Sequence, residues 1–175
     1  MLAVLLILLG AVMRLLPHAA NFTPIAAIAL FGGVYLRPRY ALFLPIVALV
    51  GSDIILGFDS FESRLTVYGS FMVVGLIGVV LRKHKSLTAI IMGTFVGSVV
   101  FYLVTNFAYF YSPAMYAHNW SGVVSSYYNA LPFFRNTLLG DVFYVGLLFG
   151  LYEAAAYVAV HKGGLLNTRQ IRRGE

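Results

Sequence analysis

The sequence predicts an all-α integral membrane protein of one domain, built as a bundle of six transmembrane helices. The chain of 175 residues is 61% hydrophobic and only 10% charged, whereas about a quarter of the residues in a soluble domain are charged. Its apolar runs are long and continuous, which favours helices over a β-barrel. The absence of cysteine excludes disulfides and thiolate chemistry.

Six hydrophobic segments are the predicted helices, and polar or basic joints separate them. Their boundaries are good to a few residues. The approximate ranges are 1–16, 24–36, 40–56, 65–81, 86–111 and 136–160, followed by a basic cytoplasmic tail at 161–175.

The first segment, MLAVLLILLGAVM, has a signal peptide as its competing interpretation. It lacks the charged region with which signal peptides begin, and Arg14 interrupts the end of the apolar stretch. We therefore expect a retained first helix.

The second segment is short for a crossing. Thirteen residues of helix span about 20 Å, against a hydrocarbon core of about 30 Å. Thr23 is the expected N-cap and Pro24 the first helical residue. The positive end of this helix is thus expected below the outer membrane surface, where its N–H groups must face protein, water or ligand. A tilted bundle in a locally thin bilayer is the alternative.

Small residues in the last two segments predict close helix contacts. Gly93-x-x-x-Gly97 lies in the fifth segment, and Gly146-x-x-x-Gly150 in the sixth. Glu153 lies beside the second of these seams. We expect it to face a neighbouring helix and to have a hydroxyl or basic partner.

The basic residues predict the orientation. Nine of the twelve Lys and Arg residues lie at 37–39, at 82–85 and in the tail. With an even number of crossings these places and both termini share one side, which the positive-inside rule makes cytoplasmic. The expected location is the cell inner membrane, in contact with anionic lipid. The net charge of +6 is attributed to these loops and not to binding of nucleic acid.

Residues 112–135 form the longest predicted connection, with many tyrosines, Trp120, His118 and two prolines. A connection of this length is usually functional or disordered, and this one is too aromatic for disorder. An interfacial aromatic belt and a lid over a cavity both fit the composition.

Strong polar residues lie near the predicted outer ends of four helices and in the joint RLLPHAANFTP. Ionisable groups at membrane depth are costly when they face lipid, so they normally face the interior. We predict a polar chamber, open to the outside, that binds a small polar solute. Its predicted binding residues are Arg14, His18, Asn21, Thr23, Asp53, Asn106, Trp120, Arg135, Asn136 and Asp141.

The residue types suggest how a solute would be bound. The arginines would bind anionic groups, the aspartates would accept from donors, and the asparagines would do both. Trp120 and nearby tyrosines would stack over the solute. The alternative is a structural or assembly membrane protein without a solute. In that case Arg14 with Asp53, or Arg135 with Asp141, would be buried ion pairs that only fix helix order.

Catalytic patterns are lacking. The four histidines are scattered, with no metal-binding spacing, and neither a nucleophile elbow nor a phosphate loop occurs. A membrane enzyme is therefore the least supported class, and we expect no enzyme activity, no cofactor and no metal.

Three stretches carry a resemblance to known proteins: RLLPHAANFTPIAAIALFGG, GSD at 51–53, and PFFRNTLLGD at 132–141. They resemble an uncharacterised bacterial family of small transport-type proteins, which is similar to the substrate-binding S components of energy-coupling factor (ECF) transporters. The resemblance covers nearly the whole chain. It implies an S-component-like fold of six helices that binds a vitamin or other micronutrient from outside.

The same resemblance implies partners: a transmembrane T subunit and two cytoplasmic ATPases. Many S components present an Ala-x-x-x-Ala surface to the T subunit on their first helix. This chain lacks that surface in its first segment, because Ala3 is followed four residues later by Ile7, and Ala11 by Leu15.

Overall fold

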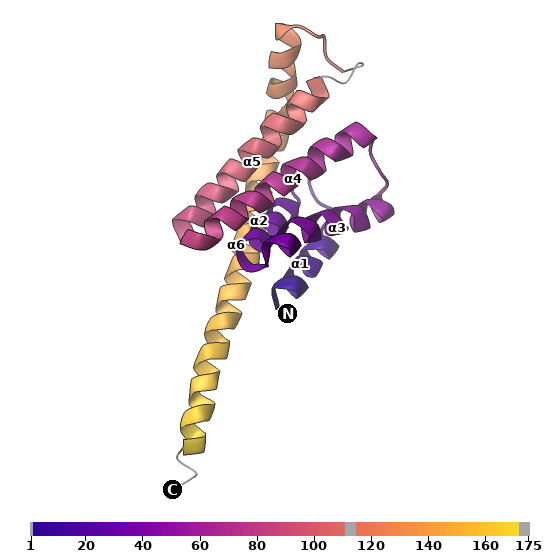
Figure 1. The fold of residues 1–175 in the computed structure, drawn as a ribbon. Helices are drawn as coiled ribbons and strands as arrows, with labels where there is room; N and C mark the ends of the chain where they lie inside the picture. The colour runs from indigo at the N-terminus through magenta and orange to yellow at the C-terminus, as the bar shows by residue number, and fades with distance from the viewer. Residues whose placement is uncertain (1, 111–114, 172–175) are drawn as a thin grey trace.

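The computed structural model describes residues 2–110 and 115–171. In that part of the chain it confirms an all-helical bundle without strands. Figure 1 shows the helices in chain order. They are α1 (Leu2–Met13), α2 (Ile25–Tyr35), α3 (Pro38–Leu56), α4 (Phe61–Leu81), the short 3-10 helix η1 (Arg82–His84), α5 (Leu87–Phe110) and α6 (Trp120–Ile171).

Four helices of the described chain are long and apolar enough to cross a membrane: α3, α4 with η1, α5 and α6. Helices α1 and α2 have 12 and 11 residues, or about 18 Å and 16 Å at 1.5 Å per residue. Both are shorter than a hydrocarbon core of about 30 Å. The bundle is thus compatible with a multi-pass membrane protein, and a count of six crossings stays a prediction.

Helix α2 is the centre of the bundle (Figure 1) and contacts each of the other five α-helices. Every residue from Ile25 to Val34 is buried. Its sequence, IAAIALFGGVY, has no polar side chain before its last residue, as expected for a helix surrounded by protein. The shortness predicted for this segment is therefore real.

The amino end of α2 differs from the prediction. Pro24 occupies the N-cap position without a side-chain hydrogen bond, and Thr23 makes no capping bond to the described residues. The predicted Thr23 cap is wrong because its side chain lines a cavity instead. The first-turn N–H groups of Ile25 and Ala26 consequently have no acceptor within the helix.

Glycines allow α2 and α4 to cross at backbone contact distance. A Cβ atom added to Gly33 would lie 2.6 Å from the Cα of Gly78, and one added to Gly78 would lie 2.8 Å from the Cα of Gly33. The seam predicted at Gly93 and Gly97 is confirmed, because both are buried and an added Cβ at Gly97 would lie 3.3 Å from Val74. The absence of side chains at these glycines thus allows α2 and α5 to pack closely against α4.

The second predicted seam is wrong. Gly146 and Gly150 are exposed, and an added Cβ would meet no described atom within 4 Å. The bundle side of α6 is formed instead by the buried residues Tyr144, Val145 and Leu148. The small-residue stripe turns outward because these larger apolar side chains fill the interface.

Helix α6 corrects the prediction for residues 112–135. It begins at Trp120 and runs for 52 residues, through Pro132, to Ile171, while residues 111–114 lie outside the described chain. A proline within a helix removes a single backbone hydrogen bond, which an otherwise apolar helix tolerates. The basic tail is likewise helical up to Ile171, with Arg172 and Arg173 outside the described residues, and Figure 1 shows this part leaving the bundle.

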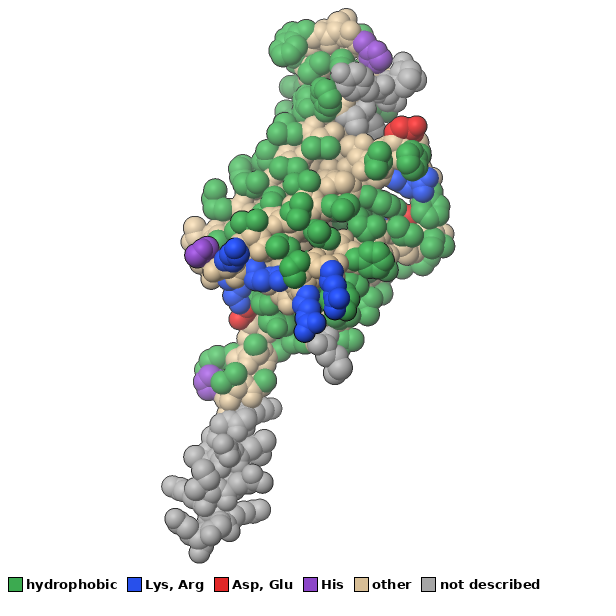
Figure 2. Space-filling model, viewed as in Figure 1, with side chains coloured by type: hydrophobic (Ala, Val, Ile, Leu, Met, Phe, Trp, Pro, Cys, Tyr) green, Lys and Arg blue, Asp and Glu red, His purple; other side chains and the backbone are tan. Residues whose placement is uncertain are grey.

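The basic joint after α4 binds the carboxyl end of α2. Arg82 donates to the carbonyl oxygen of Gly33 at 2.6 Å and to that of Leu36. Lys85 Nζ lies 2.5 Å from a carboxylate oxygen of Glu153, which also accepts from the hydroxyl of Tyr35. The expected hydroxyl or basic partner of Glu153 is confirmed, with one of each. In Figure 2 most visible Lys and Arg side chains gather near this end of an otherwise mostly hydrophobic surface.

Candidate functional site

A cavity of about 500 Å³ lies at the amino end of α2. Its walls come from the joint before α2, the first residues of α2, and the facing sides of α3, α4, α5 and α6. This size lies within the range of about 300–1,000 Å³ typical of small-molecule sites. The opposite end of α2 is the one bound by Arg82, so the cavity and the basic joints lie at opposite ends of the central helix.

Half of the predicted binding residues line this cavity. Arg14 follows α1, and Asn21 and Thr23 come from the joint before α2. Asn106 comes from the end of α5, and Asp141 from the middle of α6. The structure therefore brings together residues that lie as far apart in the sequence as Arg14 and Asp141.

The other predicted residues lie elsewhere. Trp120 is 79% exposed at the start of α6, and Arg135 is exposed. The ring of His18 is exposed and lies 3.2 Å from the carbonyl oxygen of Arg14. Asn136 donates to the carbonyl oxygen of Ala20 at 3.0 Å.

The predicted pair of Arg135 with Asp141 is absent because α6 is a continuous helix through this region. Phe133, Thr137 and Asp141 follow at intervals of four residues and share the face that lines the cavity. Arg135 falls on another face of the same helix.

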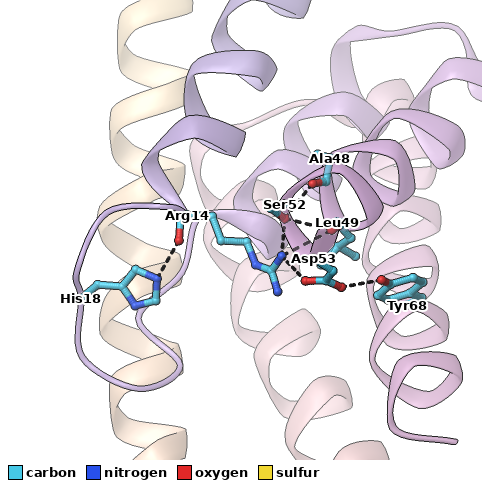
Figure 3. A network of polar contacts seen from close by, with 7 residues as sticks. All are labelled: Arg14, His18, Ala48, Leu49, Ser52, Asp53 and Tyr68. Carbon is cyan, nitrogen blue, oxygen red and sulfur yellow. Dashed lines mark hydrogen bonds and ion pairs between the residues drawn. The ribbon is translucent and has the colours of Figure 1, made fainter. Parts of the chain in front are cut away.

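Arg14 is held in a polar network that Figure 3 shows from close by. Its Nη1 lies 2.5 Å from Oδ1 of Asp53 and also donates to the hydroxyl of Ser52. The second oxygen of Asp53 accepts from the hydroxyl of Tyr68. Side-chain exposure is 18% for Arg14 and 11% for Asp53. Asp53 thus lies behind the wall of the cavity, and Arg14 forms part of the wall.

All the hydrogen bonds of the Arg14 side chain within the described chain leave from Nη1. Its Nε and Nη2 donors have no partner in the described chain, and Arg14 lines the cavity. Ile25 and Ala26, the first two residues of α2, line the same cavity, and the amino end of a helix adds a partial positive charge there. This part of the cavity can donate hydrogen bonds to an acceptor.

The opposite wall presents acceptors. The hydroxyls of Thr105, Ser126 and Thr137 donate to carbonyl oxygens of their own helices, at 2.7, 2.8 and 3.0 Å. A hydroxyl has one donor and two acceptor positions, so these oxygens can still accept. Nδ2 of Asn106 likewise donates to the carbonyl oxygen of Tyr102 at 2.7 Å, which leaves its Oδ1 as an acceptor.

Asp141 is the most deeply buried carboxylate on this wall. Its residue is 3% exposed, and its Oδ2 accepts from Ser98 Oγ at 2.6 Å. No salt bridge to Asp141 exists in the described chain. The arrangement suits noncovalent binding, and no group of three possible metal-ligating residues occurs among the described residues.

Sequence reasoning missed several residues of the site, among them Ser98, Thr105, Ser126 and Asn129. On α5, Ser98, Tyr102 and Thr105 follow at the helical spacing of four and three residues, a polar stripe that the sequence contains. Ser126 and Asn129 were missed because residues 112–135, which include them, were predicted as a connection and not as a helix.

The comparisons with known proteins name no function. The search of curated proteins found no match, and the search of solved structures found none. Residues 1–162 match the model of a family described as "Family of unknown function (DUF6580)". Because this match covers most of the 175 residues, the chain belongs to the DUF6580 family.

Proposed function

We propose that this chain binds a small polar solute in the cavity at the amino end of α2, as the substrate-binding subunit of a membrane transport system. The cavity itself carries the proposal: it measures about 500 Å³, lies inside an otherwise apolar bundle, and has Arg14, Asn21, Asn106 and Asp141 among the apolar and aromatic side chains of its lining. Polar and ionisable groups at membrane depth are costly, and where they surround a cavity they mark solute pathways by default.

The proposed orientation has the cavity facing outside. The basic joints at 37–39 and 82–85 lie at the other end of the bundle, and the positive-inside rule assigns that end to the cytoplasm. Solute would then enter from outside, in the inner membrane of a cell, and both termini would be cytoplasmic.

The two short helices suggest a refinement of the six-crossing topology. An added Cβ at Gly32 would lie 3.6 Å from Ile7, and one at Gly10 would lie 2.8 Å from Ile28, so α1 and α2 run antiparallel. We infer a re-entrant hairpin that enters and leaves on the cytoplasmic side. Its joint, 14–24, would then reach membrane depth, where non-helical backbone is tolerated only if protein or a polar cavity surrounds it. Half-helix amino ends pointing at solute are a recurrent feature of transporters.

The orientation has a direct test, since the natural chain has no cysteine. Lys83 and Ser121 are both exposed and lie toward opposite ends of the bundle. We expect a single cysteine at Ser121 to react with an impermeant thiol reagent in intact cells, and one at Lys83 to react only after lysis. Labelling of Lys83→Cys from outside would invert the topology.

A second candidate function is a structural protein with an internal polar network. The contacts among Arg14, Ser52, Asp53 and Tyr68 favour it, because they join the residue after α1 to α3 and α4 without a solute. On this reading the cavity would be incidental, and filling it would change nothing except packing.

The two candidate functions predict different results when a larger side chain fills the cavity. Asn129 is exposed yet lines the cavity, so Asn129→Trp adds bulk there at small cost to folding. Its control is Tyr128→Trp, at an exposed neighbouring position outside the lining. We expect native mass spectrometry to find a retained small molecule in the wild type and in Tyr128→Trp, and to find none in Asn129→Trp at equal thermal stability. Identical spectra for all three proteins would favour the structural protein.

The transport partner is a further part of the proposal. The chain has no phosphate loop, so energy for transport would come from other subunits. The resemblance to S components suggests a transmembrane T subunit and two cytoplasmic ATPases. The solute would then be a micronutrient, such as a vitamin, captured from outside.

A further inference from the structure

Asp141 lacks a counter-charge in the described chain. The two salt bridges of the described residues join Arg14 to Asp53 and Lys85 to Glu153. Arg14 is the single basic side chain among the described residues that line the cavity, and Asp53 already neutralises it. A carboxylate at membrane depth is costly unless a proton or a cation neutralises it.

The hydrogen bond from Ser98 satisfies Asp141 only in part. Ser98 Oγ lies 2.6 Å from Oδ2 of Asp141 and 3.0 Å from the carbonyl oxygen of Thr94. One hydroxyl hydrogen serves one of these acceptors at a time. Oδ1 of Asp141 has no hydrogen bond to the described chain, and Asp141 lines the cavity. This oxygen is therefore available to a donor in the cavity.

The cavity wall that carries Asp141 also presents hydroxyl acceptors. Thr137 lies one turn before Asp141 on α6, and Thr105 lies seven residues after Ser98 on α5; both hydroxyls donate their hydrogens to backbone carbonyls, so their oxygens are left as acceptors. An occupant that hydrogen-bonds to these two hydroxyls must therefore bring its own N–H or O–H donors.

Aromatic side chains form another part of the lining. The rings of Phe71 and Phe101 are stacked with centroids 4.9 Å apart, and those of Tyr102 and Phe134 lie 4.6 Å apart. Such rings bury the apolar body of a ligand, and their faces attract cations. This lining is not suited to a hard metal ion such as Ca²⁺ or Mg²⁺, because these ions require six or more oxygen ligands.

We propose that the solute is a small organic cation whose protonated nitrogen is bound by Asp141 and whose N–H groups bind the hydroxyls of Thr105 on α5 and Thr137 on α6. This inference rests on the solute-binding function proposed above. The aromatic rings would hold the body of the cation. Arg14 and the amino end of α2 would bind an acceptor group at its other end, if it carries one.

The test uses probes of matched shape on the purified protein in detergent: benzamidine, benzamide and benzoate, and phenethylamine with phenethyl alcohol. We expect each cation to bind at least about tenfold more tightly than its neutral counterpart, as measured by calorimetry. In Asp141→Asn we expect the affinity for cations to fall by about 30-fold, with little change for neutral probes. Asparagine keeps the shape and can still accept from Ser98.

Glu62→Gln is the matched control, because it also removes one carboxylate charge, and Glu62 is exposed and does not line the cavity. It should keep the preference for cations. Cations that bind no better than neutral probes to the wild type would overturn the inference without any variant, and so would a preference that survives in Asp141→Asn. Neutral or anionic probes that bind in a manner abolished by Asn129→Trp would leave the cavity as a solute site of another class. If no probe binds and no molecule is retained on purification, the inference and the proposed function both fail.

Discussion

Asp53→Ala is expected to lower the free energy of unfolding by about 3 kcal/mol or more. The substitution leaves the mostly buried guanidinium of Arg14 without its carboxylate, and it also removes the acceptor for the hydroxyl of Tyr68. Arg14→Gln should cost a similar amount, because it leaves the carboxylate of Asp53 uncompensated. The fraction folded across a denaturing detergent series measures both.

A double variant tests whether this loss of stability comes from leaving one charge of the Arg14–Asp53 pair without its partner. Arg14→Met with Asp53→Leu removes both charges and keeps apolar volume, so it should recover much of the stability lost in either single variant. Asp59→Ala is the control, because this exposed aspartate forms no ion pair in the described chain. Single variants as stable as the wild type would mean that solvent, and not the partner, compensates these charges.

Gly78→Ala is expected to destabilise the bundle by up to about 3 kcal/mol, the upper end of the cost of overpacking. The added Cβ would lie 2.8 Å from the Cα of Gly33, which is backbone and cannot rotate away. Helices α2 and α4 would have to separate, and α2 is the helix that contacts each of the other five α-helices. The midpoint of thermal unfolding measures the loss.

Gly146→Ala is the matched control on α6. An added Cβ there meets no described atom within 4 Å, and alanine is a better helix former than glycine by about 1 kcal/mol. This variant should be as stable as the wild type or more stable. Equal losses at Gly78 and Gly146 would show that the crossing of α2 and α4 tolerates a side chain.

The sequence by itself determined the class of the molecule and much of its local structure. Composition and continuous apolar runs are enough to predict a helical membrane bundle, because burial in lipid is a property of each segment. The seam at Gly93 and Gly97 was predicted correctly from spacing along one helix. For Glu153 only the chemical type of its partner was predicted, from the cost of an unpaired carboxylate at membrane depth. The partners themselves, Tyr35 and Lys85, lie on other elements far away in the sequence.

The tertiary structure alone decided which polar residues meet. Asp141 was predicted near the outer end of a helix starting at 136, but α6 starts at Trp120, so about 30 Å of helix precede it. Continuity through Pro132 depends on the helices packed around it, which hydropathy does not reveal. The same continuity turned Arg135 away from the cavity.

The tertiary structure also decided the position of the cavity. It forms where the amino end of α2 meets α5 and α6, and α2 is held there by the close approach of Gly33 and Gly78. Pairing Arg14 with Asp53, while leaving Asp141 unpaired, likewise depends on how α1, α3 and α6 are rotated about their axes. Segment hydrophobicity is a local quantity, whereas helix rotation and crossing are set by contacts between residues far apart in the chain.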